Sequence, residues 1–416
     1  MNKVFTAVGA ASMSLMAACL INTNSVSASE VIFNPLQSAV PSLTIAPDAR
    51  GGGMGDVGAA TKPDLNSQYW NPAKYAQMEG QGGAALSYTP WLRKIVSDID
   101  LVYLSGYYKI NEGRAISASL RYFSYGEINL TDMPGPTGEV VSTGTANPYE
   151  FSVDLGYSQM LSEYWSAAVA LRFICSDITN GISSDGASSE AGHAVGADVA
   201  AFYRKPLYLG ETGKPSYLSF GGNISNIGSK ISYDGGDTEE FIPTNLRLGA
   251  GYEYNFDDYN SLSLFFDVNK LLVPTSPVAP EPEDYEGGAS SEEYRAAYEK
   301  YENDYKDYRD KSSIGGIFTS FGDAPGGFSE EMKEIMWSLG LEYTYNKMFS
   351  VRGGYYHESE SKGNRKYFSV GAGFKLSVFE LNAAYLISTA SSNPLDQTLR
   401  FSLGFNIDGL KKLAEN

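Results

Sequence analysis

Cysteine and histidine are scarce in this chain of 416 residues. It contains two cysteines, Cys19 and Cys175, and two histidines, His193 and His357. Cys19 lies in the N-terminal apolar stretch and Cys175 has no second cysteine to pair with, so a disulfide framework is excluded. Neither histidine has another His or a Cys at ligand spacing, which argues against a metal site.

Basic residues and catalytic motifs are also few. The chain has 31 Lys and Arg against 49 Asp and Glu, a formal net charge of -18. Nucleic acid is therefore excluded as a partner, because phosphate contacts need clustered basic residues. "GMGDVG", residues 53–58, matches the dinucleotide fingerprint, but Pro63 breaks the helix that should follow. No G-x-S-x-G elbow is present. We expect no enzyme and no cofactor, and a role in binding, transport or assembly.

Long apolar runs are confined to the N-terminus. Residues 4–20 are apolar, follow Lys3, and lead to "SVSA", which ends at Ala28. This pattern predicts a signal peptide, residues 1–28, that is removed after export. The alternative is a lipoprotein with its lipid on Cys19, since "LMAAC" places small residues before that cysteine. No later run approaches the ~18 apolar residues of a membrane-spanning helix.

The rest of the chain is dominated by alternation of apolar and polar residues. In "LRFSLGFNI", residues 399–407, apolar side chains face one way and Arg400 faces the other. Arg121 and Lys375 likewise fall on the polar face of their strands. A soluble β-sandwich and a membrane β-barrel both produce this pattern. The barrel requires this placement, because a basic residue facing lipid costs about 2–4 kcal/mol at the midplane.

Connector lengths favour the barrel. Fourteen strands are predicted to begin near residues 83, 100, 114, 148, 164, 194, 216, 245, 261, 335, 348, 366, 379 and 397. Every second connector is tight and the others are longer, as in barrels with short periplasmic turns and long outer loops. We therefore expect an all-β fold, a 14-stranded antiparallel transmembrane outer-membrane β-barrel over residues 82–407, with a periplasmic tail over residues 408–416.

Two segments depart from the alternation. Residues 29–81 are rich in Gly, Pro, Ala and Asn, and a segment that starts at the periplasm before strand one is expected to fold into the lumen as a plug. The longest outer loop, residues 272–334, contains "SSEEYRAAYEKYENDYKDYRDK", residues 290–311. Its tyrosines recur at steps of four and three, which predicts a helix with one aromatic stripe. The stripe is formed by Tyr294, Tyr298, Tyr301, Tyr305 and Tyr308. It is interpreted either as a lid on the barrel mouth or as a docking face for a partner.

Several stretches resemble a known family. "PDARGGGMGDVGAATKPDLNSQYWNPAKYA", residues 47–76, is similar to the opening of FadL-like outer-membrane barrels, and more specifically to the PorV (LptO) family of the type IX secretion system. "GIFTSFGDAPGGFSEEMKEIMWSLGLEY", residues 316–343, is a second match, and "NISNIGSKISY", residues 223–233, a weaker third. The motif residues of the predicted plug are Pro47, Asp48, Arg50, Gly53, Met54, Gly55, Asp56, Trp70, Asn71, Pro72 and Ala73. In the outer loop, Phe318, Phe321 and Phe328 join the tyrosines as candidate binding residues.

The resemblance implies a fourteen-stranded outer-membrane barrel with an N-terminal hatch. It also implies a shuttle that accepts secreted cargo by a C-terminal β-domain signal at the type IX translocon. The shuttle would deliver cargo to an attachment complex containing the sortase PorU with PorQ and PorZ, where cargo is joined to lipopolysaccharide. Two alternatives remain: a FadL-like transporter of hydrophobic small molecules, and a scaffold of the attachment complex. A role in lipid A deacylation has been suggested for the family, but this sequence offers no catalytic residues for that reaction.

Overall fold

The computed structural model describes residues 33–94, 96–132, 141–178, 190–208, 213–236, 238–389 and 395–414. The predicted signal peptide, residues 1–28, and Cys19 within it lie outside these ranges. Among the helices that are described, none combines the length and apolar character of a membrane-spanning helix.

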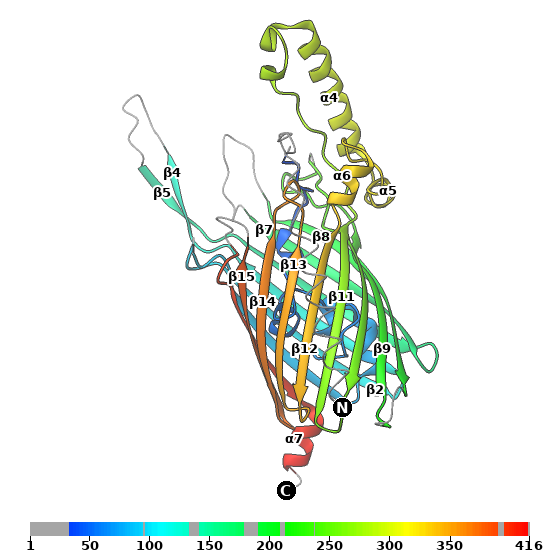
Figure 1. The fold of residues 1–416 in the computed structure, drawn as a ribbon. Helices are drawn as coiled ribbons and strands as arrows, with labels where there is room; N and C mark the ends of the chain where they lie inside the picture. Colours follow the sequence, from blue (N-terminus) through cyan, green and yellow to red (C-terminus); the bar gives the residue numbers. More distant parts are fainter. Residues whose placement is uncertain are drawn as a thin grey trace. The chain divides into compact units, whose positions relative to one another are not determined.

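Fourteen antiparallel strands close into a barrel (Figure 1). The first strand, β1, pairs with both β2 and β16. The strands are β1 (Gly82–Pro90), β2 (Asp100–Asn111), β3 (Arg114–Ser124), β6 (Tyr149–Met160), β7 (Trp165–Asp177), β8 (Gly192–Leu207), β9 (Ser216–Gly228), β10 (Asn245–Asn255), β11 (Asn260–Leu271), β12 (Met336–Tyr345), β13 (Phe349–His357), β14 (Lys366–Lys375), β15 (Phe379–Ser388) and β16 (Leu399–Asn406). Each begins within two residues of its predicted start, so the predicted fold is confirmed.

The burial pattern of the strands is that of a membrane barrel. In β3, Ile116 faces outward and is 48% exposed, whereas Arg121 faces the lumen and is 3% exposed. Arg400 is likewise buried inside the barrel, and Lys375 lines a cavity at the end with the short turns. A soluble sandwich would bury its apolar face, so the outward apolar face identifies the surface that meets lipid.

The two rims of the barrel differ as predicted. Tight turns join β2 to β3, β6 to β7 and β12 to β13 at one rim, which is the periplasmic rim of such barrels. The outer rim carries the long connectors. One of these contains a hairpin of β4 (Ile128–Asp132) and β5 (Val141–Ala146), where the sequence predicted only a loop.

The connector from β11 to β12 is built mainly of helices. They are η3 (Pro282–Asp284), η4 (Gly288–Ser290), α4 (Glu292–Asp310), α5 (Ser313–Thr319) and α6 (Phe328–Lys333). At the opposite rim, the predicted tail continues β16 as helix α7 (Ile407–Ala414).

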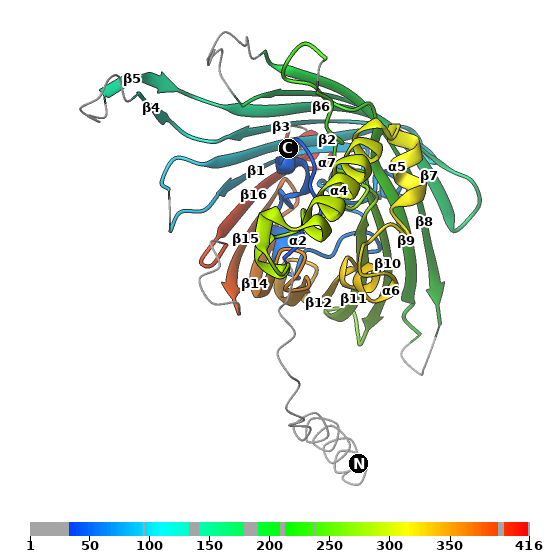
Figure 2. The same cartoon turned by 90° about the horizontal axis from the view of Figure 1, so that it is seen from above.

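The N-terminal segment, residues 34–81, lies inside the ring of strands (Figure 2). Its short helices are η1 (Pro41–Thr44), α2 (Ala49–Gly52), α3 (Ser67–Trp70) and η2 (Pro72–Gln77). Glycine and proline keep them short, since neither residue propagates a helix.

The direction of this segment differs from the expectation that it starts at the periplasm. The backbone N–H of Asn34 donates to the carbonyl of Ser361 (2.9 Å), in the outer loop between β13 and β14. At the other end, the N–H of Gln81 donates to Asp408 in α7 (2.8 Å). The described segment therefore runs through the lumen from the outer rim to the periplasmic rim.

Candidate functional site

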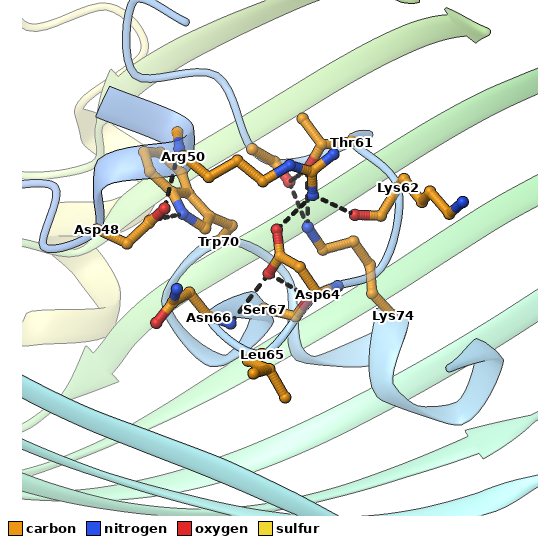
Figure 3. A network of polar contacts seen from close by, with 12 residues as sticks. Asp48, Arg50, Thr61, Lys62, Asp64, Leu65, Asn66, Ser67, Trp70 and Lys74 are labelled. Carbon is orange, nitrogen blue, oxygen red and sulfur yellow. Dashed lines mark hydrogen bonds and ion pairs between the residues drawn. The ribbon is translucent and has the colours of Figure 1, made fainter. Parts of the chain in front are cut away.

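Asp48 organises the first turn of the lumenal motif. Its Oδ2 accepts the N–H of Gly51 (2.9 Å) and so caps α2, while its Oδ1 accepts the indole N–H of Trp70 (Figure 3). Trp70 is buried, and a Cβ on Gly51 or Gly58 would lie 2.3 or 2.1 Å from its ring. Gly51 and Gly58 thus make room for the indole of Trp70.

Arg50 ties the segment to the barrel wall. Its Nε and Nη2 donate to the two carboxylate oxygens of Glu342 on β12, at 3.1 and 2.9 Å. Its Nη1 donates to Asp64 and to the carbonyl of Lys62 within the segment (Figure 3). Glu342 also accepts from Arg352 on β13 (2.6 Å). The fork of the guanidinium suits such a two-point contact, which a lysine would not reproduce.

Gly53 and Gly55 bring the backbone of the segment against the wall. A Cβ on Gly53 would lie 3.0 Å from the Cα of Gly371 on β14. Gly55 has φ +71°, its N–H donates to the hydroxyl of Ser369 (2.7 Å), and a Cβ there would lie 2.6 Å from the backbone of Tyr355. Both close approach and left-handed backbone therefore require glycine at residue 55.

Met54 and Asp56 continue this contact with side chains. Met54 is buried in a cluster with Phe265 of β11. Asp56 accepts the hydroxyl of Tyr367 (2.6 Å) and pairs with the guanidinium of Arg400 on β16.

The Asn-Pro-Ala tripeptide fixes the other side of the segment. The Asn71 side chain donates to the carbonyls of Ala59 and Ala201, each at 3.0 Å, and accepts the N–H of Ala73 (3.1 Å). Pro72 is the first residue of η2, where a missing N–H costs nothing. Pro47, which precedes the motif, is buried as well.

The structure therefore brings all eleven predicted motif residues together as packing and anchoring groups inside the barrel. Their partners on the wall, such as Glu342 and Ser369, were missed by sequence reasoning. The available signal was weak: each is a polar residue on the lumen-facing side of a strand. Many other lumen-facing residues share that pattern without contacting the segment.

The predicted tyrosine helix is present as α4. Ser291 caps it by accepting the N–H of Tyr294 (3.0 Å), and its five tyrosine rings follow one another at 5.8–5.9 Å between centroids. Tyr308 alone among them is buried, with its ring against Phe241 (5.8 Å), and burial raises its pKa to about 12. Tyr298 and Tyr305 are 39% and 36% exposed. Since α4 rises away from the barrel (Figure 1), Tyr308 is the one tyrosine of the stripe that packs in a buried cluster at the base of the loop.

The predicted phenylalanines lie on and beside α5 and α6. Phe318, Phe321 and Phe328 are 75%, 54% and 80% exposed, and Ile314 and Met332 nearby in the sequence are also exposed. Exposed apolar groups on an outer loop are typical of an interaction surface. We refer to Tyr294, Tyr298, Tyr301 and Tyr305 with these three phenylalanines as the aromatic surface.

A buried ion-pair cluster holds the base of this loop, and we call it the loop clamp. Lys270 of β11 pairs with Glu331 (3.1 Å) and Glu334 (2.5 Å), and Lys362 pairs with Glu330 (2.6 Å) and Glu334 (3.0 Å). The acids come from "SEEMKE" in the second family-like stretch. That stretch thus carries the anchor of the loop as well as its exposed phenylalanines.

Residues 29–278 match a family described as "Type IX secretion system protein PorV". The chain belongs to the PorV family. It is accordingly a type IX secretion system component, and its barrel places it in the outer membrane.

Solved barrels are also similar to the chain. The Pseudomonas putida toluene transporter TodX is 11% identical, with a TM-score of 0.46, and the match covers 90% of this chain and 99% of that one. The Ralstonia pickettii toluene transporter TbuX is 11% identical, with a TM-score of 0.42 and coverage of 86% and 96%. A Pseudomonas aeruginosa FadL homologue is 10% identical, with a TM-score of 0.41 and coverage of 90% and 99%. No curated protein matches the sequence.

Proposed function

We propose that this protein is a non-enzymatic cargo shuttle of the type IX secretion system. It binds the C-terminal β-domain of secreted proteins as they leave the translocon and delivers them to the surface attachment complex of PorU, PorQ and PorZ, where cargo is joined to lipopolysaccharide. The observation that carries the proposal is the aromatic surface: seven exposed or half-buried aromatic side chains on an outer loop whose base is clamped. Tyrosine and phenylalanine supply large contact area at low entropic cost, as anchors of protein interfaces do.

The N-terminal segment serves in this proposal as a plug. It fills the lumen and is anchored to β8, β11, β12, β14 and β16, so the barrel stays closed while cargo is held outside. Capture then depends on the loops and not on passage through the barrel.

The test compares two triple variants of the same helix. Tyr298→Ala, Tyr301→Ala and Tyr305→Ala remove the centre of the stripe, whereas Glu299→Ala, Asn303→Ala and Asp307→Ala change the opposite face of α4. Tagged protein is purified gently from outer membranes, and co-purified cargo with an intact C-terminal domain is quantified by mass spectrometry. We expect a loss of cargo of at least tenfold for the tyrosine variant only, because a single interface anchor worth ~2 kcal/mol already changes affinity by about thirtyfold. Equal recovery from both variants, at equal protein levels, would refute the role of the stripe.

Transport of hydrophobic small molecules is the second candidate function. It is supported by the Asn-Pro-Ala motif and by the cavities on either side of the N-terminal segment. The cavity on the outer side of the segment is lined by four arginines, which does not suit an apolar ligand. Purification that yields a stoichiometric apolar ligand, with no cargo and no secretion partner, would favour this function over the shuttle.

A further inference from the structure

Four arginines line one cavity inside the barrel, which we call the arginine cavity. It has a volume of about 60 Å³ and lies between the N-terminal segment and the outer halves of the strands. Arg172, Arg247, Arg365 and Arg400 contribute to its wall, and Asp56 is the one carboxylate among the described residues that line it. Four guanidinium groups against one carboxylate leave an excess of positive charge in the wall of the cavity, and this excess favours the binding of an anion.

Three of these arginines have carboxylate partners. Arg172 pairs with Asp154 (2.6 Å) and Asp198 (3.0 Å), Arg365 pairs with Glu358 (2.7 Å), and Arg400 pairs with Asp56. Arg247 differs, since it interacts electrostatically with Asp267 on the neighbouring strand but has no described carboxylate within ion-pair distance. Its guanidinium instead lies over the ring of Trp70, 4.4 Å from the centroid, and is thereby held in place.

Two of the arginines that line the cavity each have a guanidinium nitrogen without an acceptor. Nη1 of Arg247 and Nε of Arg400 are buried and have no hydrogen-bond acceptor within the described part of the chain. The Arg400 side chain is only 1% exposed. A buried charged donor without an acceptor is costly, and an anionic oxygen is the acceptor that relieves this best.

The arginine cavity adjoins a second cavity at the outer rim. That outer cavity has a volume of about 460 Å³ and shares the lining residues Thr44, Leu271, Met336 and Arg365 with the arginine cavity. An anion would therefore arrive from the side of the long loops, whereas the N-terminal segment separates it from the periplasmic rim.

We propose that the arginine cavity binds a compact anion, a phosphate or carboxylate group, with Arg247 as its principal donor. The planar guanidinium fork matches the oxygens of both groups. The volume suits a group of a few heavy atoms, since about 10–15 Å³ on the same measure holds one water. This binding site goes beyond the shuttle function and does not depend on it, because none of its residues belongs to the aromatic surface.

The test measures thermal unfolding of the purified full-length barrel in detergent. Sodium phosphate or sodium acetate is titrated against sodium chloride at equal ionic strength. We expect a saturable rise of Tm with phosphate, acetate or both, beyond that in chloride. Arg247→Gln should weaken the apparent affinity about tenfold or more, as the loss of a charge-assisted hydrogen-bond donor does. The matched control is Arg93→Gln in an outer loop, where Arg93 is exposed and pairs with Asp100, and its titration should equal that of the wild type.

A second variant covers the case in which Arg247→Gln does not fold. Asn269 lines the same cavity and its buried Oδ1 has no donor in the described part of the chain, so Asn269→Asp adds negative charge beside the proposed anion. It should abolish the Tm response without removing an arginine. A Tm that follows ionic strength alone, or an unchanged titration in Asn269→Asp, would overturn the proposal and leave water as the occupant. Short-chain phosphatidic acid in the same assay identifies the source: tighter binding than phosphate indicates a lipid headgroup, and equal or weaker binding indicates the free ion.

Discussion

Buried ion pairs are the residues on which the lumenal segment depends most. Arg50 and Glu342 are both nearly inaccessible, and Glu342 is shared with Arg352. Replacing such a pair by apolar residues can be neutral, but removing one partner leaves a charge in a place that water does not reach. Arg50 therefore matters for stability mainly because its loss would leave the buried carboxylates of Asp64 and Glu342 without this partner.

We predict that Arg50→Met lowers the free energy of unfolding by about 3 kcal/mol. The carboxylate of Asp64 would lose its arginine partner, and that of Glu342 would keep only Arg352. The midpoint temperature of the mobility shift between folded and unfolded barrel on a gel measures this. Arg93→Met is the control: Arg93 and Asp100 are 44% and 31% exposed, so their pair should contribute about 0–1 kcal/mol. Equal midpoints for the two variants would contradict the anchoring role of Arg50.

The outer loop is the element whose position matters for function. It extends from the barrel on α4, yet its base is held by the loop clamp, in which Glu334 accepts from Lys270, Lys362 and Thr275. A loop fixed at its base presents its aromatic groups in a defined place, which reduces the entropy lost when a partner binds.

We predict that Glu334→Gln releases the loop without opening the barrel. Two buried lysines would lose a charged acceptor, so the local unfolding free energy should fall by about 2 kcal/mol and trypsin should cut residues 272–335 about tenfold faster or more. Timed proteolysis followed by mass spectrometry gives the cleavage rate. Glu360→Gln, at an exposed pair with Lys366, is the matched change and should leave the rate unaltered. Similar rates for both would show that the clamp does not hold the loop.

The whole barrel is kept filled by a segment that passes through it. The anchoring contacts reach strands on several sides, so the segment is held as part of the barrel core and not as a flap at one rim. A barrel of this size without such a filling is expected to enclose water.

We predict that deletion of residues 34–77 opens a pore, because the strands alone cannot fill the lumen. The full-length protein should stay near the baseline conductance in planar bilayers, and the deletion should produce discrete conductance steps. Deletion of residues 292–310, which removes α4 but leaves the lumen filled, should behave like the full-length protein. A folded deletion barrel that remains closed would assign the closure to the outer loops instead.

Local patterns in the sequence determined much of this protein. The fourteen barrel strands, the alternation of short and long connectors, and the helix α4 were predicted correctly. Their causes act within a few residues: the two-residue period of a strand, the 3.6-residue period of a helix, and the chemistry of turns and caps.

The closure of the sheet determined the contacts between residues that are far apart in the sequence. Arg50 and Glu342 are 292 residues apart, and only the closure and register of the barrel place them within hydrogen-bond distance. The same holds for the arginines that share one cavity, for the entry of the N-terminal segment at the outer rim, and for the exposure of Tyr298. Each depends on which distant strands face each other across the lumen, and no local period encodes that.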